Sequence, residues 1–176
     1  MLKQVQHDKI HMISKKIIAY LAKNKVKYDL VKHKKVFTAF DLSQTLKEKM
    51  QKIAKTLLVK TDKKYVLVVL PAHYRLDMAK VRKFLKVKKA ELAPEQVMKK
   101  VFQVVPGAMT PFGSLHKVEV ILDKALIKAK EVLVSAGSFT ESMRLKAKDL
   151  QKLENATLAD LGKLAEIKIK KVLKKK

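Results

Sequence analysis

The sequence predicts a mixed α/β fold in which a curved, barrel-like mixed sheet is flanked by helices. Residues 56–70 hold two apolar runs rich in β-branched residues, separated by a short polar turn, which is the pattern of a β-hairpin. Stripes of apolar residues at helical spacing precede and follow this hairpin, so helices and strands are interspersed along the chain. The 176 residues show neither an internal repeat nor a linker, and we expect a single domain.

The N-terminal part of the chain is expected to form helix, strand and helix. Residues 11–26 place apolar side chains at helical spacing, and Asn24 would end that helix. Residues 27–33 alternate between apolar and polar side chains, as a short strand does. Residues 36–55 then indicate a second helix, which begins near Thr38.

After the hairpin, two further helices and two strands are expected. Residues 76–87 have an apolar stripe behind Asp77, a good N-cap residue. Residues 93–102 carry a second stripe, with Pro94 at a first-turn position. The apolar runs that predict strands are residues 117–122 and 131–137.

The two ends of the chain are expected to lie outside a core of residues 12–155. Residues 1–11 would be an N-terminal extension. Residues 157–176 would form a basic C-terminal helix or tail, with Thr157 as the helix cap. The core would therefore end just before that cap.

The charge of the chain points to a polyanionic partner. Lys and Arg together number 41 against 16 Asp and Glu, which gives a net charge of +25 at pH 7. Nucleic acid is the commonest such partner, although a lysine-rich proteome or a solubility effect would also produce this charge. Lysine suits phosphate contacts, whereas reading of bases favours arginine, so binding to the backbone is expected. The arginines are Arg75, Arg82 and Arg144.

Several kinds of site are excluded by the sequence. The absence of cysteine removes disulfides, thiolate catalysis and Cys-ligated zinc. His7 and His11 are four residues apart, but no third ligand accompanies them, so we expect no metal. Neither a P-loop nor a Gly-x-Ser-x-Gly elbow is present. No apolar run approaches the length of a membrane span, and we expect a cytoplasmic protein without a cofactor.

An uncharged loop is the first candidate functional feature. Residues 101–116 contain no Lys, Arg, Asp or Glu, and they hold two of the four glycines and two of the four prolines. Prolines restrict φ, glycines permit close approach of the backbone, and free N–H groups can hold an oxyanion or a carbonyl. The alternative is a structural turn with Phe112 in the core.

Lys55 is the second candidate. It stands where the helical pattern of residues 36–55 gives way to the hairpin. A lysine at such a junction could turn its ammonium inward, to stabilise an oxyanion or to hold a ribose or phosphate oxygen. The alternative is a solvated surface lysine, one of many in this chain.

Three segments, residues 55–77, 106–123 and 131–153, carry a resemblance in their order and spacing. Together they resemble the YbaK/ProX-like aminoacyl-tRNA deacylases, free-standing relatives of the editing domain of bacterial prolyl-tRNA synthetases. The resemblance runs from about Tyr28 to Leu153. It implies hydrolysis of the ester between a wrong amino acid and the terminal adenosine of tRNA. It also implies that a ribose hydroxyl of the substrate assists a water attack, without a metal or a covalent intermediate.

The resemblance also implies site residues. The near-invariant lysine of the family falls on Lys55, which would be catalytic, and its Gly-x-x-x-Pro loop falls on residues 107–111. The substrate-binding residues that it implies are Tyr28, His33, Phe37, Thr38, Gly107, Ala108, Met109, Thr110, Pro111, Phe112, Gly113 and Ser138.

The function expected is release of a mischarged small amino acid, of the Cys or Ala class, from tRNA-Pro. The partner is the acceptor end of tRNA, and prolyl-tRNA synthetase is a further candidate partner. A catalytically inactive tRNA-binding or nucleic-acid-binding module of the same fold is the alternative. A cationic membrane-surface protein ranks last, because the tail lacks a large apolar face. The lysines expected to bind tRNA are Lys168, Lys170, Lys171, Lys174, Lys175 and Lys176.

Overall fold

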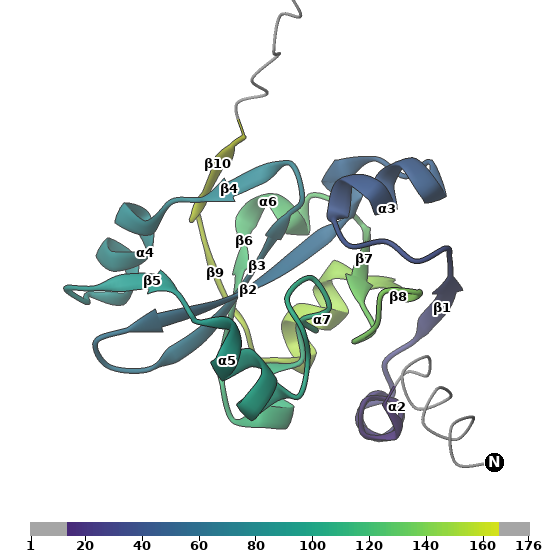
Figure 1. Ribbon diagram of the computed structural model, residues 1–176, viewed down its shortest axis with the longest axis horizontal. Helices are drawn as coiled ribbons and strands as arrows, with labels where there is room; N and C mark the ends of the chain where they lie inside the picture. The colour runs from purple at the N-terminus through teal and green to yellow at the C-terminus, as the bar shows by residue number, and fades with distance from the viewer. Residues whose placement is uncertain (1–13, 166–176) are drawn as a thin grey trace, which may run out of the picture.

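The main sheet of the protein is mixed and five-stranded. The structure, a computed structural model, describes residues 14–165. The strand order is β5-β2-β3-β6-β9, in which β5, β2 and β3 are antiparallel neighbours and β6 and β9 are added in parallel (Figure 1). The predicted hairpin is confirmed as β2 and β3. The strands are β2 (Ala54–Thr61), β3 (Tyr65–Pro71), β5 (Ala90–Leu92), β6 (Glu119–Asp123) and β9 (Thr157–Ala159).

Two smaller sheets accompany the main one. The antiparallel strands β1 (Tyr28–Lys32), β8 (Glu141–Lys146) and β7 (Glu131–Ser135) form the first, and β10 (Gly162–Leu164) with β4 (Tyr74–Leu76) forms the second. The three-stranded sheet is linked to β2 by an isolated bridge between Ile53 and Leu133. Because pairing does not continue beyond that bridge, none of the sheets in the described chain closes on itself. The expected barrel-like sheet is therefore wrong.

The helices lie around these sheets, and α3 is beside the start of β2 (Figure 1). Short turns, η1 (Met50–Lys52), η2 (Met98–Phe102, a π-helical turn) and η3 (Gly113–His116), connect several elements. The α-helices are α2 (Lys15–Lys23), α3 (Ala39–Leu46), α4 (Met78–Leu85), α5 (Glu95–Val97), α6 (Lys124–Ile127) and α7 (Ala147–Leu153).

The predicted helix ends are largely confirmed. Asn24 ends α2, and the side chains of Thr38 and Asp77 cap α3 and α4 by accepting backbone N–H bonds. The helix expected over residues 36–55 is shorter than predicted. It ends at Leu46, because Lys47 adopts the left-handed conformation, with φ of 51°, and turns the chain toward β2.

The expected C-terminal helix with a Thr157 cap is wrong where the structure describes it. Residues 157–159 instead form β9, which pairs in parallel with β6. Pairing with a buried strand satisfies this backbone and buries Ala159. The folded core therefore continues past residue 155. Residues 1–11 and the six tail lysines lie outside the described residues.

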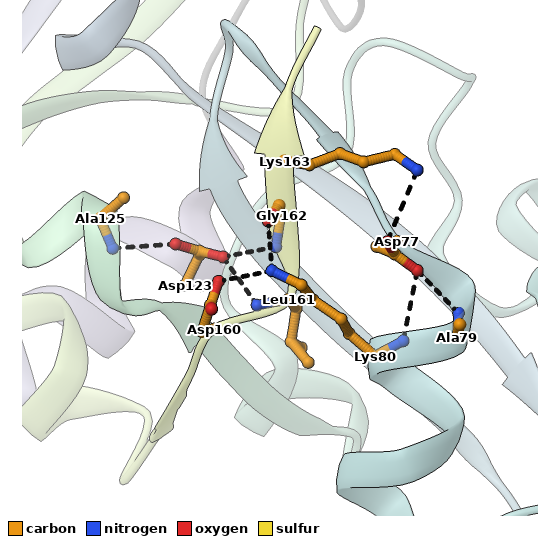
Figure 2. A network of polar contacts seen from close by, with 9 residues as sticks. All are labelled: Asp77, Ala79, Lys80, Asp123, Ala125, Asp160, Leu161, Gly162 and Lys163. Atoms are coloured by element: carbon orange, nitrogen blue, oxygen red, sulfur yellow. Dashed lines mark hydrogen bonds and ion pairs between the residues drawn. The ribbon is translucent and has the colours of Figure 1, made fainter.

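A buried carboxylate fastens the β9–β10 turn to the main sheet (Figure 2). Asp123 is 1% exposed, and its Oδ1 accepts from the N–H of Ala125 at the start of α6. Its Oδ2 accepts from the N–H groups of Leu161 and Gly162, at 3.0 and 2.8 Å. Lys80 of α4 adds an ion pair to the exposed Asp160 at 3.0 Å.

Asp123→Ala is expected to lower the free energy of unfolding by about 2–4 kcal/mol, because it removes a helix cap and leaves buried N–H groups without acceptors. Asp160→Ala is the control and should cost no more than about 1 kcal/mol, since its ion pair is exposed. Urea denaturation of both variants measures the difference. Equal losses in the two variants would contradict a structural role for Asp123.

Candidate active site

A cavity of about 190 Å³ lies where the start of β2, the segment before α3, the uncharged loop and the β7–β8 hairpin meet. Seven sequence-predicted residues line it: His33, Phe37, Thr38, Lys55, Gly107, Met109 and Ser138. Its other walls come from Val36, Ala39, Leu42, Ile53, Ala54, Thr56, Leu57, Leu133, Ser135 and Ser142. The fold therefore brings Lys55 and the start of the Gly-x-x-x-Pro loop to one cavity.

Lys55 is half-buried near the start of β2 and is not a solvated surface lysine. Burial lowers the pKa of its ammonium, and the positive charge of Arg75 lowers it further. Among the described residues, none of the side chains that line the cavity is a carboxylate. The ion pairs found among residues 14–165 do not include Lys55. The cavity therefore holds a poorly hydrated cation that can stabilise a developing negative charge.

His33 is held by both of its ring nitrogens. Nδ1 lies 2.8 Å from the carbonyl oxygen of Lys34, and Nε2 lies 2.9 Å from Oγ of Ser142. A carbonyl can only accept, so Nδ1 carries a proton, and in the neutral form of the ring Nε2 accepts from the Ser142 hydroxyl. The pair forms an oriented polar wall of the cavity.

Gly107 brings the loop against the segment that precedes α3. Its φ is +87°, in the left-handed region that favours glycine. A Cβ at this position would lie 2.8 Å from the backbone oxygen of Phe37, which is too close for a real contact. Glycine is therefore needed here for both its conformation and its size, and the close approach closes one side of the cavity.

Apart from Met109, which lines the cavity, residues 108–113 serve the packing of the core. Residues 108–113 are six consecutive buried residues, which explains why none of them is charged. Phe112 is fully buried, with its ring edge toward Tyr20 at a centroid distance of 6.3 Å. A Cβ on Gly113 would lie 2.4 Å from the oxygen of Val118. The sequence-predicted residues that do not line the cavity are Tyr28, Ala108, Thr110, Pro111, Phe112 and Gly113.

A buried carboxylate anchors the end of this loop. Glu154 is 6% exposed and accepts through Oε2 from both the N–H and the hydroxyl of Ser114, each at 2.8 Å. Its Oε1 accepts from the Tyr20 hydroxyl at 3.0 Å. The turn that follows the loop is thereby tied to α2 and to the end of α7.

Sequence reasoning missed Ser142, which lines the cavity, and His73, whose pKa is affected by the charge of Lys55. Ser135 and Ser142 are paired residues of β7 and β8, a hairpin that the polar turn at residues 137–140 could have indicated. His73 follows β3 and has a buried Nδ1 without a hydrogen-bond partner in the described part of the chain. Burial lowers its pKa, and the charge of Lys55 lowers it further.

Comparison with known proteins assigns the family. The family model of the aminoacyl-tRNA editing domain matches residues 33–153, which is most of the chain. The chain belongs to the aminoacyl-tRNA editing domain family. This confirms the resemblance to YbaK/ProX-like proteins that the sequence segments indicated.

Individual relatives of the editing domain agree with this assignment. The prolyl-tRNA editing protein ProX of Acetoanaerobium sticklandii is 28% identical over 146 residues, which cover 80% of this chain and 89% of that protein. The proline–tRNA ligase of Macrococcus caseolyticus is 27% identical over 102 residues, covering 58% of this chain and 18% of the ligase. The matched region is thus a small part of that ligase.

Solved structures share the fold of the editing domain. A protein described as a candidate trans-editing enzyme for prolyl tRNA synthetase has a TM-score of 0.74 at 22% identity, covering 84% of this chain and 94% of that one. A hypothetical protein has a TM-score of 0.79 at 18% identity, covering 85% of this chain and all of that one. Identities this low establish the mixed α/β fold alone.

The described residues of the editing domain lack two further features, a metal-binding cluster and a membrane-spanning helix. No three or more His, Cys, Asp or Glu side chains gather there in a way that could hold a metal ion. Among residues 14–165, no helix has both the length and the apolar character that a membrane crossing requires.

Proposed function

We propose that the protein is a trans-editing aminoacyl-tRNA deacylase that hydrolyses the ester of a small amino acid, of the Cys or Ala class, on tRNA-Pro. The observation that carries this proposal is the half-buried ammonium of Lys55 in a small cavity whose described lining holds no carboxylate. Membership of the editing-domain family supports the reaction class. The similarity to a prolyl-tRNA editing protein supports the choice of tRNA, and prolyl-tRNA synthetase is the proposed partner.

In the proposed reaction a water oxygen adds to the ester carbonyl carbon, and a ribose hydroxyl of the substrate assists the attack. The carbonyl oxygen becomes an oxyanion, which the ammonium of Lys55 stabilises by a hydrogen bond. Collapse of the tetrahedral intermediate breaks the bond to the terminal ribose oxygen, which leaves with a proton. The oriented pair of His33 and Ser142 and the Gly107 turn hold the ester in place.

Size would select the amino acid. A cavity of about 190 Å³ is smaller than the roughly 300–1,000 Å³ pockets that enclose drug-sized ligands. Apolar walls from Val36, Leu42, Ile53 and Leu133 exclude large or charged side chains. One methylene changes binding in such a pocket by only about 1–3 kcal/mol, so overlapping activity on Ala and Cys is expected.

The net charge of +25 equally suits a second candidate, a tRNA-binding module without catalytic activity. Binding of uncharged tRNA would be the same for both candidates. Release of an amino acid distinguishes them, because only the deacylase cleaves the ester.

The full-length protein is expected to release alanine or cysteine from mischarged tRNA-Pro in the presence of a chelator, because no step above uses a metal. The measurement is the loss of radiolabelled amino acid from tRNA, with tRNA alone as the control. Binding without release at any enzyme concentration would favour the inactive module. Activity that disappears with chelator and returns with zinc would contradict the metal-free mechanism.

A further inference from the structure

Two phenylalanines next to the cavity are exposed to solvent. Phe37 and Phe40 are 59% and 61% exposed. They are the two most exposed aromatic side chains of the described residues, and the next is Phe84, at 39%. Phe37 also lines the cavity. Phe40 does not line the cavity but follows Ala39, which does, and exposed aromatic rings beside a candidate active site point to a binding partner.

The local structure holds the ring of Phe37 and the backbone between the two phenylalanines in place. Thr38, between them in sequence, caps α3 by accepting from the N–H of Asp41 at 3.0 Å. The ring of Phe37 packs against the ring of Phe139, at a centroid distance of 4.9 Å. Leu42 and Ser43 are the buried residues of α3, whereas Phe40 on the same helix is exposed. An aromatic ring that is already held in place, as that of Phe37 is, binds a planar ligand with little loss of conformational entropy.

The surroundings of the platform carry positive charge. Nζ of Lys35 lies 5.2 Å from the centre of the Phe37 ring, and Lys34 beside it is exposed. Aromatic rings combined with lysines are the usual means by which proteins bind single-stranded nucleic acid, with bases stacked on rings and phosphates beside cations. A neutral apolar partner would not need these lysines.

The size of the cavity determines what would reach the platform. About 190 Å³ accommodates a small aminoacyl group, but not also the nucleoside that carries it. If the ester lies at Lys55, the base of the terminal nucleotide lies outside the mouth, where Phe37 is the exposed wall. We propose that Phe37 and Phe40 form a stacking platform for the unpaired bases at the 3′ end of the tRNA acceptor strand. This inference rests on the proposed function.

The test uses a short RNA ending in CC followed by 2-aminopurine, whose fluorescence falls when the base stacks. The RNA carries no amino acid, so the result is independent of hydrolysis. Binding to the wild-type protein should quench the fluorescence. Phe40→Leu should weaken binding by about tenfold and reduce the quenching, since one stacked base contributes on this order. Phe40→Tyr should restore both, because the ring is retained.

Phe84→Leu is the matched control, since Phe84 is an exposed phenylalanine of α4 that does not line the cavity, and it should bind the RNA as the wild type does. If Phe40→Leu binds the RNA and quenches the fluorescence as the wild type does, the stacking platform is wrong, and a protein partner would explain the exposed rings. Phe40-dependent quenching in a protein that releases no amino acid would support the platform and contradict the proposed function instead.

Discussion

Lys55→Met is expected to lower the single-turnover rate of deacylation at saturating tRNA by about 10²–10³, the effect of losing one oxyanion donor. Methionine keeps an unbranched side chain of similar length and removes the charge. The affinity for tRNA should change little, because one lysine among 38 contributes a small part of the electrostatic attraction. The measurement is a rate at several tRNA concentrations, extrapolated to saturation.

Lys60→Met is the matched control, because Lys60 lies on the same strand with its side chain exposed. It should retain the wild-type rate. If saturating tRNA restores the rate of Lys55→Met, then Lys55 is a phosphate clamp and the catalytic assignment fails.

The stability of Lys55→Met separates a catalytic role from a structural one. The pKa of Lys55 is lower in the folded protein than in the unfolded chain, so the unfolded state binds more protons between the two values. The wild-type protein should therefore gain stability as the pH rises through that interval, whereas Lys55→Met should lack this gain. At neutral pH the variant should be at least as stable as the wild type, because a desolvated cation has been removed. A large loss of stability would point to a structural lysine.

The long elements of this fold could be predicted from the sequence because their patterns are local. The hairpin β2–β3 has two unbroken apolar runs, and Thr38, Asp77 and Asn24 mark helix ends by the chemistry of their own side chains. The arrangement of the sheets could not be predicted in the same way. Three-residue strands such as β4, β9 and β10 exist because of distant partners, and no local pattern indicates them.

The candidate site was predictable only in part, for a related reason. Lys55 gains its significance from burial and from the proximity of Arg75, neither of which a sequence displays. The lack of charge in the loop has two causes that look the same in sequence. Gly107 faces the cavity, whereas Phe112 is buried in the core, so one uncharged stretch serves both the site and the packing.

Gly107→Ala is expected to lower kcat/KM for deacylation by about 10², the effect of moving a positioning group by roughly 1 Å. The added Cβ would lie 2.8 Å from the backbone oxygen of Phe37, so either the loop or the segment before α3 must shift. Both border the cavity that holds Lys55. A single-turnover assay with subsaturating enzyme measures the change.

Gly137→Ala is the matched control for backbone strain. Gly137 also has a positive φ, +92°, but a Cβ there would meet only Thr110 Cγ2 at 3.5 Å, an ordinary contact. Each alanine should cost roughly 1–2 kcal/mol of stability from its left-handed conformation. Only Gly107→Ala adds a clash at the cavity, so only that variant should lose most of its activity while it remains folded. Equal activity in the two variants would show that the approach of the loop to Phe37 does not position the ester.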